Sequence, residues 1–315
     1  MRIDVVVNTN AHLYRTKPGL VGAVKDACRG RAEVFVTATM EDLERATAAI
    51  AARGSDLVVL SGGDGSFMAG VTSLARALGD RELPRIGLMA GGTVATVARN
   101  WGKVGDPLGF VEALLRNPDA LRSTPRPTLR VREQRGAAAT ERVGFIFGTG
   151  LVARFFDVYY ADGARGYGGA ARIVARIFVE SFIGGAYARR VLDPLPCSIE
   201  VDGRRLAPPA WSLVCASVVR NLGIHMLVNY RAGEDPSRVH LVASPLPSRS
   251  LGPRAPLVLA GKRIGGPGHF DDLVSAFTVR FDPDGPYVLD GEILRASEVT
   301  VSAGPVIRVV EPLAG

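Results

Sequence analysis

Two glycine-rich turns constrain this chain more than any other feature. The first, Ser61–Ser66 (SGGDGS), follows the apolar run Asp56–Leu60 and precedes a segment with helical spacing of apolar residues. The second, Ala90–Thr93 (AGGT), again stands between a strand-like run and a helical segment. Strands that alternate with helices predict a parallel sheet, and such sheets bind ligands at the carboxyl ends of their strands. We expect both turns to lie there, side by side.

The chemistry of these turns suits a phosphate. Main-chain amides at a helix N-terminus bind anions, and glycine lets the backbone approach a phosphate without a Cβ atom. Asp64 in the first turn would hold Mg²⁺, directly or through water, or orient the reacting group. One such turn is equally consistent with an ordinary strand-to-helix connection. Two of them, with Thr93 offering its hydroxyl in the second, predict a nucleotide site.

The pattern of expected elements changes along the chain. Strands are expected over residues 3–7, 33–37, 56–60 and 84–89, and helices over 20–28, 40–52, 67–78 and 94–101. Residues 122–127, rich in Pro and Arg, are interpreted as a linker, and short strands with turns follow, interrupted by one helix over 170–183. The expected fold is α/β, with a parallel-sheet domain (1–124) and a β-sandwich domain (125–300). The final strands, including 301–315, complete one domain or the other.

Composition limits the partners. The net charge is +7 and the pI about 9.7, with arginine far outnumbering lysine. This balance suits phosphorylated substrates, an anionic membrane surface or nucleic acid, although a genome that favours arginine codons explains it equally well. No compact basic helix or aromatic platform supports nucleic-acid binding. Three isolated cysteines, and the lack of a signal peptide or spanning segment, predict a reduced, cytoplasmic protein.

The sequence resembles the diacylglycerol kinase catalytic-domain family, which includes bacterial lipid kinases and sphingosine and ceramide kinases and is distantly related to NAD kinases and phosphofructokinases. Ser61–Ser66 resembles the family's GGDG[ST] motif, and residues 92–102 (GTVATVARNWG) resemble GTxNDFARxLG. Asn8 matches the start of the NPxxG loop. The later elements GxGxxA and DGE are matched by Gly148, Gly150 and Ala153 and by Asp290-Gly291-Glu292.

This resemblance implies an ATP site in the cleft between an α/β domain and a β-sandwich domain. Glu292 would be the base that accepts the proton of the acceptor hydroxyl, and Asp290 would support it or help to hold a metal. Mg²⁺ would be held by Asp64, with Asp235 as a further ligand. The nucleotide site would be lined by Asn8, Thr37, Gly62, Gly63, Asp64, Gly65, Ser66, Gly92 and Thr93.

The expected activity is ATP-dependent phosphorylation of a hydroxyl on a lipid such as diacylglycerol, ceramide or a sphingoid base. The enzyme would work peripherally at the inner face of an anionic membrane, as a monomer or a homodimer. Arg165, Arg172 and Arg176, beside an apolar helical face, would bind anionic headgroups or simply form a solvated side. The aromatic residues Phe155, Phe156, Tyr159 and Tyr160 would be core or the wall of a lipid pocket.

Several positions depart from the family pattern. Ala95-Thr96 stands where the second motif has Asn-Asp, and the NPxxG loop reads Asn8-Thr9-Asn10-Ala11. The metal-associated PxAxxxDG element survives only as Ala232 and Asp235. Two alternatives therefore stay open: a NAD kinase-like enzyme, and an inactive homologue that binds nucleotide or lipid. The segment GGTVATVARN differs from the GxLGFL-type segment of NAD kinases, and the retained Asp64 and Glu292 favour an active lipid kinase.

Overall fold

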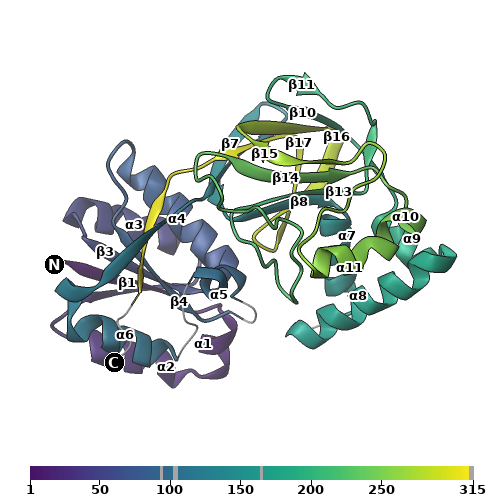
Figure 1. Ribbon diagram of the computed structural model, residues 1–315. Helices are drawn as coiled ribbons and strands as arrows, with labels where there is room; N and C mark the ends of the chain where they lie inside the picture. Colours follow the sequence, from purple (N-terminus) through teal and green to yellow (C-terminus); the bar gives the residue numbers. More distant parts are fainter. Residues whose placement is uncertain (93–94, 102–105, 164–165, 312–315) are drawn as a thin grey trace. The chain divides into compact units, whose positions relative to one another are not determined.

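The computed structural model describes residues 1–92, 95–101, 106–163 and 166–311. The chain divides into two compact units (Figure 1). Unit 1 contains Met1–Arg126 and the C-terminal segment from Val306 onward, and unit 2 contains Pro127–Pro305. The structure thus divides the chain after Arg126 and after Pro305, close to the boundaries at 124 and 300 expected from the sequence.

Unit 1 is built on a six-stranded sheet of order β2-β1-β3-β4-β18-β5. The first four strands are parallel, and β18 runs parallel to β4 and antiparallel to β5. The strands are β1 (Ile3–Asn8), β2 (Glu33–Thr37), β3 (Leu57–Gly62), β4 (Arg85–Ala90), β5 (Arg122–Arg126) and β18 (Ile307–Glu311). The last strand of the chain therefore completes the sheet of the first unit.

Helices flank this sheet. They are α1 (His12–Thr16), α2 (Gly19–Cys28), α3 (Met40–Arg53), α4 (Asp64–Leu78), α5 (Thr96–Trp101) and α6 (Pro107–Arg116), with a 3-10 turn at Pro118–Ala120. Helix α3 packs on α4, and α2 packs on α6. Helix boundaries follow local chemistry: α3 begins at a capping box between Thr39 and Asp42 and ends at Gly54, whose φ is +64°.

One expectation for this region is wrong. Residues 122–127 are not a linker, because Arg122–Arg126 forms β5, an edge strand paired with β18 along its whole length. The single proline is tolerated because an edge strand leaves one row of main-chain groups unpaired. The partner that makes it a strand lies about 180 residues further along the chain, so no local pattern reveals the pairing.

Unit 2 is built on a ten-stranded antiparallel sheet in which β15-β14-β13-β8-β16-β17-β6-β7 are consecutive neighbours, and β10 and β11 join beside β16. The short strands β9 and β12 pair separately. The strands are β6 (Leu129–Arg135), β7 (Ala138–Gly144), β8 (Ile146–Gly150), β9 (Leu195–Pro196), β10 (Ser198–Val201), β11 (Arg204–Arg205), β12 (Ala210–Trp211), β13 (Leu213–Ser217), β14 (Val239–Ser244), β15 (Phe270–Val274), β16 (Ala276–Leu289) and β17 (Glu292–Ala303).

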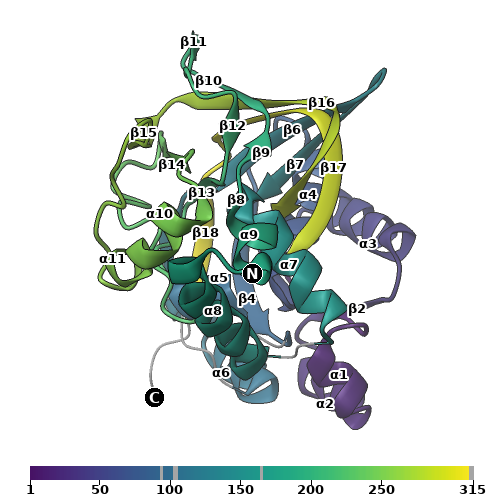
Figure 2. The same ribbon diagram turned by 90° about the vertical axis from the view of Figure 1, so that its right-hand side faces the viewer.

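Unit 2 contains more helix than expected. Its helices are α7 (Leu151–Ala161), α8 (Gly166–Ile183), α9 (Ala186–Leu192), α10 (Ser248–Leu251) and α11 (Ala255–Leu259), with a 3-10 turn at Gly252–Arg254. Helices α7, α8 and α9 lie together beside the sheet (Figure 2). Only α8 was expected, because the aromatic residues of α7 favour strands by local propensity. Within the described residues, no helix is long and apolar enough to cross a bilayer.

Candidate functional site

The two glycine-rich turns lie next to each other, as expected. β3 and β4 pair in parallel register up to Gly62 and Ala90, so the turns leave the same edge of the sheet. The amides of Gly91 and Gly92 both donate to the carbonyl oxygen of Gly62, at 2.7 and 3.1 Å. These two amides therefore hold the turns together and are not free to bind a phosphate, contrary to the expectation for the second turn.

The contact between the turns requires glycine. A Cβ atom on Gly92 would lie 2.5 Å from the Cα atom of Gly63, far inside van der Waals contact. A Cβ atom on Gly62 would lie 2.4 Å from the side chain of Ser66. Two backbones approach here to a distance that no side chain permits. Thr93, the hydroxyl expected in the second turn, lies outside the described residues.

Helix α4 begins directly after Gly63 and presents free donors. The amide of Phe67 makes the first intrahelical bond, to the Gly63 carbonyl oxygen at 3.0 Å. The amides of Asp64, Gly65 and Ser66 precede it and have no intrahelical acceptor. Gly63 has no side chain to cap them, and within the described residues no other side chain does so. These donors lie at the positive end of a fifteen-residue helix, where negative charge is favoured.

Asp64 faces the second turn. Its two carboxylate oxygens accept hydrogen bonds from the amides of Thr96 and Val97, at 2.8 and 2.9 Å, and so cap the start of α5. Burial raises the pKa of Asp64, and the two amides oppose that rise by stabilising the charged form. The carboxylate thus orders the loop opposite the uncapped amides of α4, a role that the sequence did not reveal.

Ala95, just before α5, has a φ of +49° and is buried. This left-handed conformation is uncommon for any residue with a Cβ, and asparagine tolerates it better than alanine. Ala95 stands where the resembling motif has asparagine. Ala95 therefore adopts a left-handed conformation that asparagine would adopt more easily.

The ends of β1 and β2 support the first turn. The Asn8 side-chain amide donates to the Ser66 hydroxyl at 2.8 Å, linking β1 to the first turn of α4. Thr37 is buried, and its hydroxyl donates to the Val7 carbonyl oxygen at 3.2 Å. Asn8 is thus placed beside the turn, whereas Thr37 is engaged in joining the ends of β1 and β2.

Tyr14 was missed by sequence reasoning. It is buried in α1, and its hydroxyl hydrogen-bonds the Ser61 hydroxyl at the end of β3. The neighbouring Leu13 amide donates to the Gly91 carbonyl oxygen at 3.0 Å. Helix α1 therefore braces both turns, and no spacing or motif in the sequence points to this contact.

In unit 2, Asp290 and Gly291 form a two-residue hairpin turn between β16 and β17. Both have positive φ, +50° and +87°, as the tight turn of an antiparallel hairpin requires. Asp290 is buried, and its carboxylate accepts hydrogen bonds from the amides of Phe145 and Ile146, the latter at 2.9 Å. Asp290 therefore fixes the turn that carries Glu292 and is a positioning residue.

Glu292 is the first residue of β17, and its side chain reaches solvent. Surrounding protein atoms nevertheless remove part of its carboxylate from water, which raises the pKa of Glu292 above its usual value. The Arg142 guanidinium partly opposes this rise. The aromatic row of α7 lies beside the same turn, since the Tyr160 hydroxyl donates to the Gly291 carbonyl oxygen at 3.1 Å. Phe155, Phe156 and Tyr159 pack against one another along this helix. A carboxylate with a raised pKa thus stands next to an apolar wall.

The described residues provide no ready-made metal cage. No group of three or more His, Cys, Asp or Glu side chains converges on a point in the described part of the chain. Both oxygens of Asp64 are engaged by main-chain amides, and one oxygen of Asp235 accepts from the amide and hydroxyl of Ser237. Neither carboxylate predicted as a metal ligand therefore forms part of a protein-built metal site.

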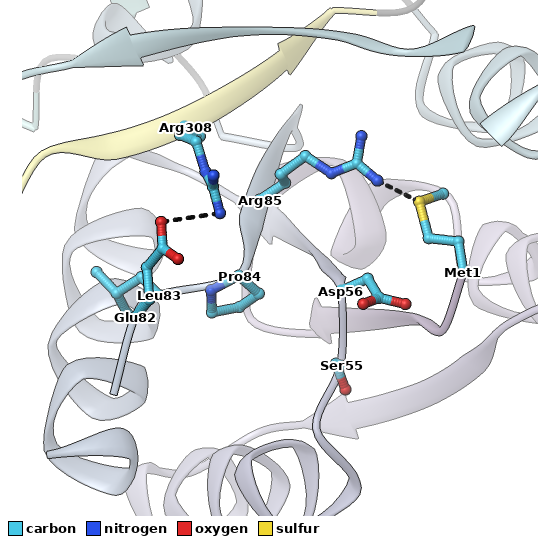
Figure 3. Close-up of a pocket in the computed structure, with 8 residues that line it drawn as sticks. All are labelled: Met1, Ser55, Asp56, Glu82, Leu83, Pro84, Arg85 and Arg308. Atoms are coloured by element: carbon cyan, nitrogen blue, oxygen red, sulfur yellow. Dashed lines mark hydrogen bonds and ion pairs between the residues drawn. The ribbon is translucent and has the colours of Figure 1, made fainter. Parts of the chain in front are cut away.

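A hollow in unit 1 lies away from these turns. It has a volume of about 450 Å³ and is lined by residues before the first strand and at the starts of β3, β4 and β18, among them Met1, Asp56, Arg85 and Arg308 (Figure 3). An ion pair between Arg308 and Glu82 spans part of it at 3.0 Å. Open α/β sheets bind ligands at the opposite edge, so this hollow is not a candidate for the nucleotide.

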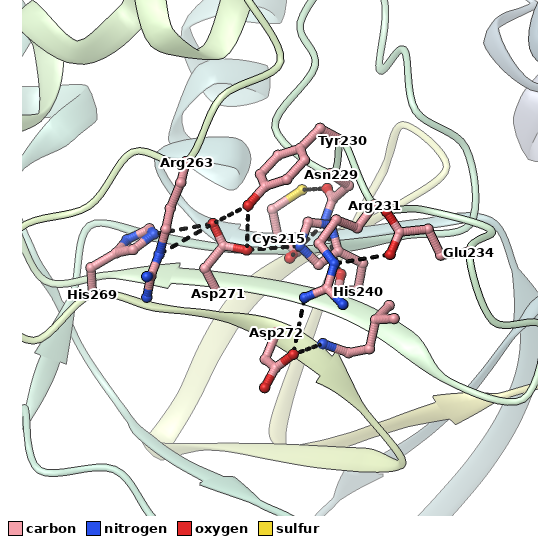
Figure 4. Close-up of polar contacts among 11 residues, drawn as sticks. Cys215, Asn229, Tyr230, Arg231, Glu234, His240, Arg263, His269, Asp271 and Asp272 are labelled. Carbon is pink, nitrogen blue, oxygen red and sulfur yellow. Dashed lines mark hydrogen bonds and ion pairs between the residues drawn. The ribbon is translucent and has the colours of Figure 1, made fainter.

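A cluster of polar side chains is buried in unit 2 (Figure 4). Asp271 on β15 lies 2.9 Å from His240 Nε2 on β14, and the Tyr230 hydroxyl donates to the same carboxylate at 3.2 Å. His269 Nε2 is 3.5 Å away on the other side. Burial alone would raise the pKa of Asp271, but the two imidazoles outweigh it and hold the pKa well below its usual range. The cluster therefore joins two strands and the loop that carries Tyr230.

Known proteins share the fold described above and are similar in sequence over part of the chain. Residues 3–121 match the family model of the diacylglycerol kinase catalytic domain. A solved diacylglycerol kinase from Bacillus anthracis is 14% identical, with a TM-score of 0.60 over 99% of this chain and 96% of that one. Yeast NADH kinase in complex with NADH is 12% identical, with a TM-score of 0.54 over 99% of this chain and 83% of that one. No curated protein sequence matches the chain.

The structural likenesses concern the fold, and the family match covers the part of unit 1 that contains both turns. The parallel sheet of unit 1 and the antiparallel sheet of unit 2 agree with the fold class expected from the sequence. Residues 3–121 are thus similar to the diacylglycerol kinase catalytic domain, and the chain shares the fold of solved diacylglycerol kinases.

Proposed function

We propose that this protein is an ATP-dependent kinase that phosphorylates a hydroxyl group of a lipid. The observation that carries the proposal is the uncapped N-terminus of α4 beside the Gly63–Gly92 contact, within a domain of this family. Free amides at a helix N-terminus, reached through glycine, suit the phosphates of a nucleotide.

The binding step uses the main chain of unit 1. The amides of Asp64, Gly65 and Ser66 donate to the nucleotide phosphates, while Asp64 keeps the second turn in place through α5. Phosphoryl transfer depends mainly on such positioning and on neutralising charge. Mg²⁺ would arrive with the nucleotide, since kinases bind it largely through substrate phosphates and water.

Glu292 is proposed as the base that accepts the proton of the acceptor hydroxyl. A general base works best when its pKa approaches the working pH, and the raised pKa of Glu292 moves it in that direction. Asp290 supports it by fixing the turn. The aromatic row of α7 offers apolar contacts to the lipid beside Glu292.

A second candidate is a NAD kinase-like enzyme. The likeness to NADH kinase favours it, because the same fold accommodates that acceptor. The two candidates differ in what the region beside Glu292 must hold: an apolar chain for a lipid, a polar nucleotide for NADH. The aromatic row on α7 favours the lipid.

The decisive experiment supplies γ-labelled ATP with Mg²⁺ to the purified protein and offers diacylglycerol, ceramide, sphingosine, phosphatidylglycerol, NAD and NADH in separate reactions. Label in one lipid product supports the proposal. Label in NAD or NADH moves the protein to the second candidate. ATP binding without turnover on any acceptor would show that the protein is a sensor.

Single substitutions test the roles proposed for Glu292 and Asp64. Glu292→Gln is expected to lower kcat by roughly a hundredfold or more, with nucleotide binding retained. Glu298→Gln is the matched control, since Glu298 lies on the same strand and forms an exposed ion pair with Arg280. Asp64→Ala is expected to weaken ATP binding by disordering the start of α5. Full activity in Glu292→Gln would remove the base assignment.

A further inference from the structure

Three bulky apolar side chains on α8 are exposed to solvent. Val179, Phe182 and Ile183 have exposed fractions of 65%, 57% and 72%. Their spacing places them next to one another on the helix surface. The other side of α8 is already buried through Ile173 and Ile177. The helix thus has a second apolar face that no described residue covers, and such a contiguous face marks an interaction surface.

Arginines accompany this face. Arg172 lies two turns before Val179 on the same side of α8 and is exposed. Helix α9 follows after the turn Gly184-Gly185 and adds the exposed Arg189 and Arg190. Within the described residues, no carboxylate pairs with any of these three guanidinium groups. Exposed apolar side chains and unpaired cations are therefore combined on one helical hairpin.

The arginines of α9 line a hollow of about 410 Å³. Its lining is completed by Arg154, Ala186 and Asp193. The Arg154 guanidinium donates to the main-chain oxygen of Asp193, which fixes it at the hollow. Three guanidinium groups face a single carboxylate, so the hollow has an excess of positive charge. A phosphate group, which guanidinium groups bind through paired donors, complements this charge.

Helices α8 and α9 are clamped together. Arg176 Nε donates to Glu180 Oε1 at 2.8 Å, and its guanidinium lies 3.9 Å from the centre of the Tyr187 ring. Glu180 also accepts the Tyr187 amide at 3.0 Å. Arg176 therefore joins the two helices and is not available for the headgroup contact expected from the sequence. Arg165 lies outside the described residues.

We infer that the α8–α9 surface, made of Arg172, Val179, Phe182, Ile183, Arg189 and Arg190, docks on an anionic membrane. The apolar side chains insert at the level of the acyl chains, and the hollow beside Arg189 and Arg190 receives a lipid phosphate. This inference rests on the proposed lipid kinase activity for its purpose. The docking itself requires neither nucleotide nor turnover.

The charge of the surface argues for a membrane over a second copy of the chain. In a symmetric dimer the same patch meets itself, so the arginines of the two copies would face one another. A bilayer containing acidic lipids offers negative charge and an apolar layer together, which is what the α8–α9 surface complements.

The test is sedimentation of the full chain with vesicles in the absence of ATP. Binding is expected to vesicles of phosphatidylcholine with phosphatidylglycerol, to be weak with phosphatidylcholine alone, and to weaken as salt rises. Arg189→Ala with Arg190→Ala should weaken binding roughly 25-fold, about fivefold for each arginine. Phe182→Ser with Ile183→Ser should weaken it at least tenfold.

Arg204→Ala with Arg205→Ala is the matched control, because these adjacent arginines are exposed on β11 of the same unit. It should leave vesicle binding unchanged. An equal loss of vesicle binding in the Arg189/Arg190 and Arg204/Arg205 variants, or no loss in either, would overturn the inference. So would conversion of a dimer to a monomer by the α8 variant without a change in vesicle binding, or displacement of vesicles by millimolar inorganic phosphate alone.

Turnover separates this inference from the proposed function. The arginine and α8 variants should phosphorylate a short-chain lipid dispersed in detergent as well as the wild type does, and lose activity only on vesicles. Wild-type vesicle binding that depends on the α8–α9 surface, without any lipid turnover, would uphold the docking and reject the kinase. Lipid turnover without vesicle binding would uphold the kinase and reject the docking.

Discussion

At the residue scale, Ala95 adopts a backbone conformation that is unfavourable for alanine. Its φ of +49° is left-handed, and the residue is buried at the start of α5. The Asp64 carboxylate caps the same helix end, and this fixes the conformation from outside. The contact that orders the loop thus compensates for a strained residue.

Ala95→Gly is therefore expected to stabilise the protein. Glycine removes the steric cost of the left-handed conformation but adds freedom to the unfolded chain, so the net gain should be roughly 0.5–1 kcal/mol. Ala98→Gly, three residues later inside α5, should instead cost about 1 kcal/mol. Urea unfolding of the two variants measures both, and equal destabilisation would contradict the strain at Ala95.

Glu292 gives a second prediction at this scale. A base must be deprotonated, and the pKa of Glu292 is raised, so kcat/KM should rise with pH through a midpoint above the usual value for glutamate. Below that midpoint the carboxylate is protonated and activity is lost. Glu292→Gln should abolish this acid limb, along with most of kcat. A pH–rate profile of wild type and variant is the measurement; an unchanged acid limb in the variant would assign it to another group.

At the element scale, the buried Asp271 joins β14 and β15. Asp271→Asn should cost roughly 2–4 kcal/mol at neutral pH, because it removes a charge held by two imidazoles and a tyrosine hydroxyl. The folded pKa lies below the unfolded one, so this stability is present above about pH 4 and is lost as the pH falls further. The difference between wild type and variant should therefore shrink in acid.

The neighbouring carboxylate offers a control for this prediction. Asp272 is 63% exposed and pairs with Arg231 at 3.1 Å on the surface. Asp272→Asn should change stability by less than about 1 kcal/mol. Urea unfolding at a series of pH values compares the free energies of unfolding of the two variants. An equal, pH-independent effect of both substitutions would show that the Asp271 cluster does not contribute this stability.

At the scale of the whole molecule, the C-terminal strand β18 pairs with strands of the N-terminal unit. β18 lies between β4 and β5, and Ile307, Val309 and Val310 are buried there. The sheet that carries both glycine-rich turns is therefore incomplete until β18 has joined it. Its folding depends on contacts of long sequence separation, which are closed at an entropic cost.

Val309→Ala should consequently destabilise the N-terminal part of the protein by roughly 2 kcal/mol, through the loss of two buried methyl groups. Hydrogen exchange should show reduced protection of amides in β3 and β4. Val299→Ala, ten residues earlier on β17, should instead reduce protection in β6 and β16 of unit 2. The same exchange pattern for both variants would contradict this division of the chain.

The sequence alone determined the parts of this protein that rest on local patterns. Apolar runs and glycine turns located strands β1 to β4 and helices α2 to α5 of unit 1, although they missed α1. Because parallel strands end at one edge, these patterns also placed the two turns together. The Asp290-Gly291-Glu292 element was also visible in the sequence through its match to the DGE motif. These features need only neighbouring residues.

Only the tertiary structure decided which main-chain and side-chain groups in these turns remain available to a ligand. It showed the Gly91 and Gly92 amides bound to Gly62, Asp64 capping α5, and Asp290 anchored where β8 begins. It also turned an expected linker into β5 by pairing it with β18. Each of these contacts joins residues about thirty or more positions apart, and hydrogen bonds across such separations leave no periodic trace in the sequence. The glycine-rich turns were visible in the sequence, but the donors they offer to a phosphate were decided by the fold.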